Sequence, residues 1–169
     1  MTAGAVDISG DLVAVPIRSS AAAMEFPQNY DFRPDLESNK GLLLDMASER
    51  SLDALLVLFV RRLAERPPIA LARVWLIGPG DICSTCPMRT ECPDQTACLH
   101  LVASAGRPSA ASGEDWSRLD GQFRRFPLGV RKVGQIAATG QAIVIPDIAA
   151  DSTWIVRPDW ARREGIRGF

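Results

Sequence analysis

The chain has 169 residues, of which 47% are hydrophobic and 23% are charged, and its formal net charge is −1. This length and balance are those of a globular protein with one core rather than two, and the charge argues against a general nucleic-acid or membrane-binding surface. The longest apolar stretches are interrupted by charge or proline well before the roughly 20 residues that a membrane span needs.

The first region of the chain is a leader of residues 1–41. Residues 1–35 mix Gly, Ser, Pro and Asp with short apolar patches, and no sustained helical or strand period emerges. We expect the leader to be partly disordered or to carry a short helix. Sustained patterns begin at about residue 42.

An amphipathic helix is predicted over about 51–65, where apolar residues recur at helical spacing: Leu52, Leu55, Leu56, Phe59 and Leu63. Ser51 can cap its start, and Pro67-Pro68 ends the run. The apolar arc is wider than one packed face requires, because it also includes Val57, Leu58 and Val60. Burial between a sheet and a leader helix would account for that width, and so would a helical dimer seam.

Two strands are predicted next. The first covers 69–77, is rich in Val, Ile, Leu and Trp, and ends at the turn Gly78-Pro79-Gly80. The second covers 99–104, with Leu99, Leu101 and Ala103 on one face and His100, Val102 and Ser104 on the other. The loop between them, 81–98, is longer than the 12–15 residues usual for a connection without structure of its own, which indicates a function.

This loop holds all four cysteines of the chain, spaced C-x2-C-x5-C-x5-C: Cys83, Cys86, Cys92 and Cys98. Four thiols so close together predict a four-thiolate site for a metal ion or an iron–sulfur cluster. Polar residues and prolines surround them, so ordinary core packing does not explain them. A disulfide pair of the secreted type is disfavoured because the N-terminus lacks signal-peptide features, and we expect a cytoplasmic protein. A thioredoxin-like CxxC would have two cysteines in a β-α-β pattern.

The spacing favours an iron–sulfur cluster, of the 4Fe-4S type, over zinc. Zinc ribbons offer two CxxC-like pairs, and here only Cys83 and Cys86 form one. Prolines follow Cys86 and Cys92 directly, as in iron–sulfur loops. His100, the one histidine, can replace a ligand or orient one from outside the thiolate set. An outward-facing strand residue is the simpler interpretation of His100.

The last third of the chain predicts four short elements. These are a strand at about 125–128, a helix at 133–139 closed by Gly140, a strand at 142–145 that ends at Pro146-Asp147, and a helix at 160–164 between Pro158 and Gly165.

The order of these elements from 42 to 169 resembles a GAF domain, a small-molecule sensor module related to the PAS fold. The segments that carry the resemblance are the helix, 72–76 (ARVWL), the strand ending at 105–106, 126–129 (FPLG), 133–142 (VGQIAATGQA), 144–147 (VIPD), Asp151, Trp160 and 164–169 (EGIRGF). The short helix that runs into a strand and an Ile-Pro-Asp turn is the most specific of them. The four-cysteine insertion resembles a subset found in sensor regions of bacterial transcriptional activators and histidine kinases.

The resemblance implies an α+β fold with a central antiparallel sheet and flanking helices. It also implies that the domain ends early, without the last strands and the closing helix of the family. The ligand pocket of such domains corresponds here to Phe126, Val133, Ile136, Trp154 and Trp160. From the residues alone, each of these is more simply a core or capping residue.

The resulting hypothesis is a regulatory sensor domain that feeds a transcriptional or kinase output. It would hold a metal centre in the cysteine loop, form a homodimer through helix 51–65 and respond to a small-molecule effector, without binding nucleic acid or membrane itself. No Walker-type loop, G-x-S-x-G elbow or H-E-x-x-H motif is present, so we expect no enzyme. An iron–sulfur electron carrier and a ligand-binding GAF module with a purely structural zinc site are the alternatives.

Overall fold

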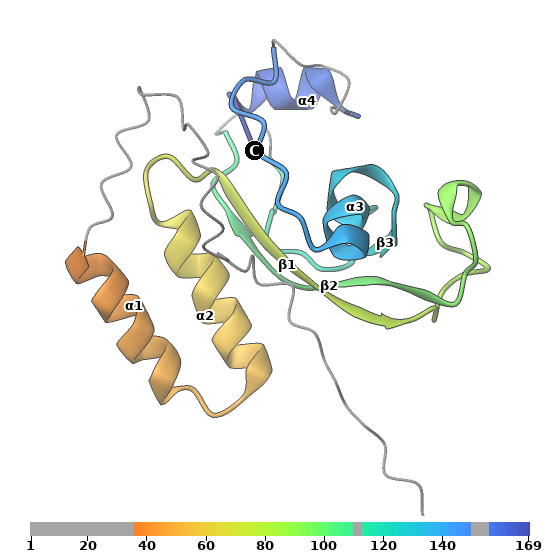
Figure 1. Ribbon diagram of the computed structural model, residues 1–169. Coiled ribbons are helices and arrows are strands. Elements are labelled where there is room, and N and C mark those ends of the chain that lie inside the picture. Colours follow the sequence, from red (N-terminus) through yellow and green to blue (C-terminus); the bar gives the residue numbers. More distant parts are fainter. Residues whose placement is uncertain (1–35, 110–112, 150–155) are drawn as a thin grey trace, which may run out of the picture.

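A computed structural model describes residues 36–109, 113–149 and 156–169 of the chain. These residues form an α+β structure in which a three-stranded antiparallel sheet is flanked by helices (Figure 1), which confirms the expected fold class at this coarse level. The described elements are α1 (Leu36–Ser48), α2 (Leu52–Ala64), β1 (Leu71–Pro79), a 3-10 turn (Arg89–Glu91), β2 (Ala97–Gly106), β3 (Arg125–Pro127), α3 (Arg131–Thr139) and α4 (Pro158–Arg163).

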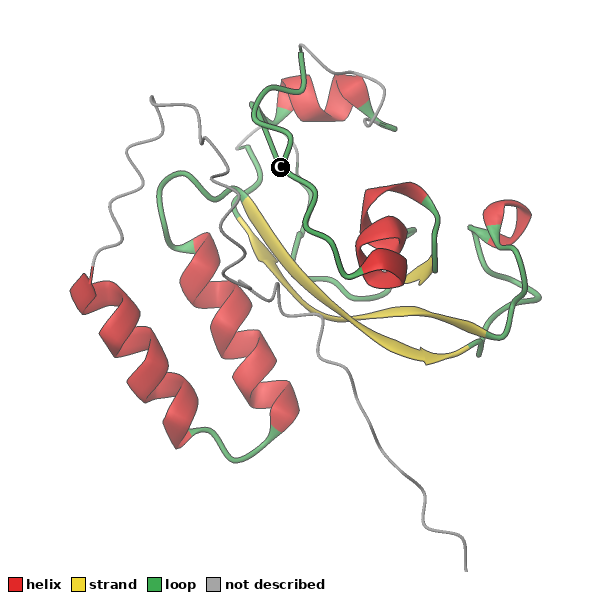
Figure 2. Cartoon of the chain, viewed as in Figure 1, coloured by secondary structure: helices red, strands yellow, loops and turns green. Residues whose placement is uncertain are grey.

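The sheet is built on the long β1–β2 hairpin, with strand order β1-β2-β3 (Figure 2). β1 pairs with β2 from Leu71 opposite Gly106 to Pro79 opposite Ala97, and one register irregularity lies at Val74/Trp75. β3 adds a short edge strand in which Phe126 lies opposite Leu99. The cysteine loop is therefore the connection at the far end of this hairpin, away from α1 and α2.

Helix α2 forms as predicted and packs on the sheet. The side chain of Ser51 accepts a hydrogen bond from the backbone of Ala54 at 3.1 Å, which caps its first turn. Leu56, Val60 and Ala64 are buried against small residues of the sheet, which are Ala72, Ala103 and Ala105. Ala72 and Ala105 pair with each other near the end of the β1–β2 hairpin that is opposite to the cysteine loop.

Helix α1 lies beside α2 and was not predicted as a full helix. It starts in the proposed leader and runs across residues 41 and 42, where the sequence pattern changes. Asp45 of α1 forms an ion pair with Arg62 of α2. The remainder of the leader, residues 1–35, lies outside the described residues.

The predicted elements after β3 are mostly confirmed. α3 ends at Gly140, whose φ of 67° lies in the left-handed region that suits glycine. α4 has Pro158 in its first turn, as expected. The predicted strand at 142–145 is wrong, because residues 142–145 form no strand. Instead, the backbones of Ile145 and Phe169 exchange two hydrogen bonds of 2.9 and 2.8 Å, too short a pairing to extend the sheet.

No described helix is both long and apolar enough to cross a membrane.

Candidate metal centre

The cysteine loop is closed at its base and ordered by its own backbone. The Gly80 amide donates to the carbonyl of Thr96 at 2.8 Å, which joins the two ends of the loop. Inside it, the Thr85 amide donates to the carbonyl of Ile82 at 2.9 Å, and the amide of Arg89 donates to the carbonyl of Cys86 at 3.0 Å. The backbone groups of this long connection are thus partly satisfied without regular strands.

The fourth cysteine is a strand residue rather than a loop residue. We predicted all four thiols between the strands, but β2 begins at Ala97 and Cys98 pairs with both Gly78 and Pro127. The ladder bonds to both neighbours extend β2 two residues beyond the predicted start. Cys98 is consequently fixed and buried, with 8% of its surface exposed, whereas the other three cysteines are half-buried in the loop.

All four cysteines line one pocket, together with Asp81, Arg89 and Arg125. None of the four forms a disulfide. Among the described residues, no three of the four sulfurs lie within 4.8 Å of one another. Four thiolates around one zinc ion, each 2.3 Å from it, would be about 3.8 Å apart, so zinc would require the loop to contract.

The size of this pocket bears on whether it can hold an iron–sulfur cluster. Its cavity volume is about 20 Å³, which holds a single water-sized species. An iron–sulfur cubane is larger, so the loop would have to open to take it. Either centre therefore requires a change in the loop, inward for zinc and outward for a cluster.

Steric limits keep Cys83 close to the base of the loop. Its thiol donates to the carbonyl of Gln95 at 3.2 Å. A Cβ atom on Gly80 would lie 2.7 Å from the Cys83 sulfur and 2.4 Å from the Gln95 carbonyl oxygen. Gln95 itself has φ of 60°, an uncommon conformation for a residue with a side chain. Only glycine at position 80 leaves room for this arrangement.

A buried methionine anchors the middle of the loop. Met88 is 1% exposed and packs with Leu99 of β2 and Phe126 of β3, and Cys86 lies against the same cluster. Met88 lies between Cys86 and Cys92, so the segment that carries two proposed ligands is also the segment that packs on the core. The sequence places Met88 among polar loop residues, and nothing there identified it as a core residue.

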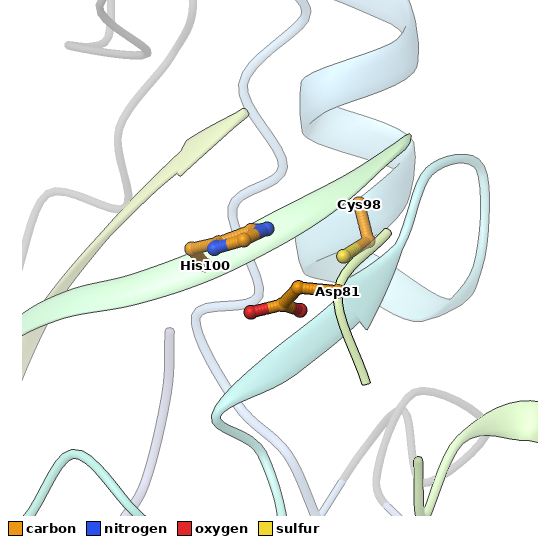
Figure 3. Close-up of side chains that lie close together, drawn as sticks. All are labelled: Asp81, Cys98 and His100. Carbon is orange, nitrogen blue, oxygen red and sulfur yellow. The ribbon is translucent and has the colours of Figure 1, made fainter. Parts of the chain in front are cut away.

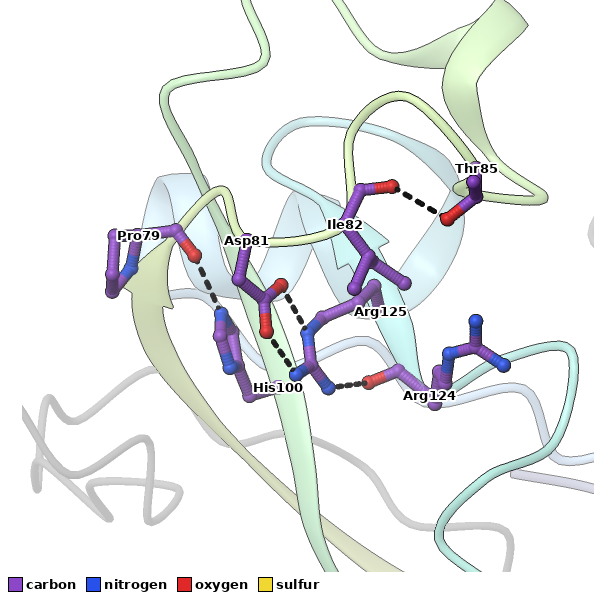
Figure 4. Close-up of polar contacts among 7 residues, drawn as sticks. All are labelled: Pro79, Asp81, Ile82, Thr85, His100, Arg124 and Arg125. Atoms are coloured by element: carbon purple, nitrogen blue, oxygen red, sulfur yellow. Dashed lines mark hydrogen bonds and ion pairs between the residues drawn. The ribbon is translucent and has the colours of Figure 1, made fainter.

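Two arginines from the β3–α3 region hold the loop by ion pairs. Arg125 of β3 donates to both carboxylate oxygens of Asp81, at 2.8 and 2.5 Å (Figure 4). Arg131, the first residue of α3, forms a second two-bond pair with Glu91, one bond of which is 2.9 Å. Hydrogen bonding from Arg125 holds the pKa of Asp81 well below its usual range, so Asp81 is ionised at neutral pH.

The protonation of Cys98 follows from its burial. Burial raises the pKa of the Cys98 thiol to about 11, and the charge of Asp81 acts in the same direction, while Arg125 opposes it. The thiol is therefore protonated at neutral pH in the metal-free chain. A metal ion would have to displace this proton, so binding would release it to solvent.

His100 lies beside the pocket on the same strand as Cys98. One ring nitrogen, Nε2, is 2.8 Å from the carbonyl oxygen of Pro79. The potential ligand atoms of Asp81, Cys98 and His100 all lie within 4.8 Å of one another (Figure 3). The sequence marks His100 as a possible ligand through its place beside Cys98, whereas Asp81 follows Gly80 as an ordinary turn residue and was not predicted.

The residues predicted for an effector pocket lie in different parts of the fold. Phe126 and Val133 belong to the cluster around Met88, and Ile136 is half-buried on α3. Trp160 packs in a separate cluster with Ile145 and Ile148, and its ring lies 5.4 Å from that of Trp116. Trp154 lies outside the described residues. An effector pocket at these positions stays a prediction.

Comparisons of the chain with protein-family models, with curated proteins and with solved structures find no match.

Proposed function

We propose that this chain is a GAF-type sensory domain whose cysteine loop binds an iron–sulfur cluster or zinc through Cys83, Cys86, Cys92 and Cys98. The observation that carries the proposal is that these four residues, which are all the cysteines of the chain, line a single pocket. Thiolates are the ligands that both centres prefer. When bound, the centre would supply a redox- or ligand-sensitive group in an otherwise ordinary α+β domain.

The charges around the pocket support an anionic centre. Four thiolates outweigh the charge of one Zn²⁺ or of a cluster core, so the loaded site would carry net negative charge. Arg89 and Arg125 both line the pocket, and Arg125 is held in place by Asp81. Guanidinium groups beside thiolates stabilise the deprotonated ligands and so favour metal binding.

The packing of the loop supports a route from the centre to the rest of the fold. The segment from Cys86 to Cys92 carries Met88, which fills a core position, and Glu91, which pairs with the first residue of α3. A change in ligation would move this segment and bias the position of α3. We propose that the output passes from there to a dimer interface that includes α2, where Leu52 and Val57 are exposed.

The proposal is tested by purifying the protein without oxygen and determining its absorbance and its iron, sulfide and zinc contents. A cluster gives visible charge-transfer absorbance with iron and sulfide in similar amounts. A colourless protein with one zinc per chain selects the zinc form. Protein that binds neither metal, or a Cys92→Ala variant that retains the metal and the order of the loop, rejects the four-thiolate site.

A further inference from the structure

The hairpin end of the sheet brings a second set of metal-binding side chains together. Cys98 and His100 are two residues apart on β2, a spacing that puts their side chains on one face of the strand. Asp81 reaches the same place from the turn after β1. The potential ligand atoms of all three lie within 4.8 Å of one another.

A hydrogen bond to the backbone of Pro79 sets the tautomer of the His100 imidazole. A carbonyl oxygen can only accept, so Nε2 must donate its hydrogen to Pro79 over their 2.8 Å separation. The neutral ring then has its lone pair on Nδ1, and an N–H to a backbone carbonyl is the usual outer partner of a metal-binding histidine. A Cβ atom on Gly78 would lie 2.9 Å from Nε2, so the glycine leaves room for this ring.

The carboxylate of Asp81 is also held by a group outside the set, the guanidinium of Arg125. Arg125 donates one hydrogen bond to each oxygen, which leaves a further lone pair on each oxygen for another partner. Hydrogen-bonded carboxylates of this kind are common among metal ligands. Asp81 and His100 are therefore each held by a group outside the set (Figure 4). Cys98 is held by the ladder bonds of β2.

We propose that Asp81, Cys98 and His100 form a second binding site for a zinc-like divalent ion, which shares the Cys98 sulfur with the four-thiolate site. The mixed sulfur, nitrogen and oxygen set suits Zn²⁺ and not Mg²⁺ or Ca²⁺, which take oxygen ligands. The three residues leave a fourth position to water, and the Cys98 thiol proton goes to solvent on binding. Because Cys98 belongs to both sets, an ion in one set occupies a sulfur that the other set also uses. The site does not depend on the proposed sensory function.

The test uses Co²⁺ as the probe, because its visible spectrum reports sulfur and nitrogen ligands. The first variant, Cys83→Ser/Cys86→Ser/Cys92→Ser, keeps only Cys98 and is expected to bind one Co²⁺ per chain with one-thiolate absorbance. Adding His100→Ala is expected to weaken that binding by more than about 100-fold, beyond the 10–100-fold that loss of an outer partner costs. Adding Arg125→Gln instead should cost about 10–100-fold. Failure of the triple variant to bind Co²⁺ with its far-UV circular dichroism intact, or indifference of binding to His100→Ala, overturns the proposal.

A milder pair of variants covers the case in which the triple variant does not fold. Cys83→Ala removes one half-exposed thiol, and Co²⁺ binding to Cys83→Ala should then depend on His100. Equal binding by Cys83→Ala and Cys83→Ala/His100→Ala would overturn the site.

His100 is the one histidine of the chain, so in protein without an affinity tag its ¹⁵N ring signals are unambiguous. A Co²⁺-induced change at Nδ1 supports the site. The single variant His100→Ala keeps all four thiols and so tests the four-thiolate site alone. It distinguishes failure of the second site from failure of the four-thiolate site.

Discussion

Replacing Met88 by alanine tests whether the cysteine loop is part of the folded core. Met88 is 1% exposed and contacts Leu99 and Phe126, so the truncation removes a fully buried side chain. Buried Met→Ala changes cost about 2–5 kcal/mol. We expect the lower part of this range, about 2–3 kcal/mol, because a loop can close over part of the cavity. In a domain of this size that corresponds to a fall in Tm of roughly 4–12 °C.

The assay is denaturant unfolding of the metal-free protein, followed by circular dichroism. Met88→Leu, which nearly conserves volume, should cost less than about 1.5 kcal/mol. Val144→Ala is the exposed control, since Val144 is 54% exposed and lies outside α2 and the cysteine loop, and should change the free energy of unfolding by less than about 0.5 kcal/mol. An effect of Met88→Ala as small as that of Val144→Ala would refute the packing of the loop on the core.

The same variant connects packing to metal binding. If Met88 holds Cys86 and Cys92 near the pocket, its loss makes both ligands mobile before binding. Each 1.4 kcal/mol of ordering free energy then weakens metal binding about tenfold. We expect Co²⁺ affinity to fall in Met88→Ala and to stay nearly unchanged in Met88→Leu. Equal Co²⁺ affinities in the two variants would show that metal binding does not depend on the packing of Met88 in the core.

Three further predictions concern the cysteine loop and the two ion pairs that hold it. Gly80→Ala should lower both the free energy of unfolding and the affinity for Co²⁺, because the alanine Cβ would meet the Cys83 sulfur and the Gln95 carbonyl oxygen. Denaturant unfolding and Co²⁺ titration measure the two effects, and no change in either would contradict the close approach. Arg125 lowers the pKa of Asp81, so the carboxylate stabilises the fold above about pH 4 and loses this effect as the pH falls below that value. The loss of stability caused by Asp81→Asn should therefore become smaller as the pH falls. Unfolding curves in which this loss grows at low pH would contradict the prediction. A double-mutant cycle of Glu91→Gln and Arg131→Gln should give a coupling free energy of about 0.5–1 kcal/mol, as for a partly exposed ion pair. A coupling of zero would show that this ion pair does not hold the loop to α3.

Local signals in the sequence were sufficient for most of the elements. Ser51 and Pro67-Pro68 bound α2, and Gly140 and Gly165 end α3 and α4, because caps act through their immediate neighbours. The predicted strand at 142–145 failed because a strand needs a partner along its length, and the sequence does not show that the backbone of Ile145 pairs with Phe169 rather than with the sheet.

The environment of the cysteines was less accessible from the sequence than the cysteines themselves. Their spacing identified the four residues, and the structure places them around one pocket. The groups that control this pocket come from far along the chain, since Arg125 lies 44 residues after its partner Asp81. Met88 has no local pattern that marks it as buried. Such long-range contacts depend on the sheet register, which a single sequence does not fix.

X-ray absorption of protein purified without oxygen counts the atoms bonded to the metal, and so tests whether the four cysteines are its ligands. We predict four sulfur neighbours per zinc ion at about 2.3 Å, or iron with sulfur ligands and short iron–iron distances. Cys98→Ala should lose this signature. A metal with no bonded thiolate sulfur, or protein that takes up neither iron nor zinc, would rule out the four-thiolate site.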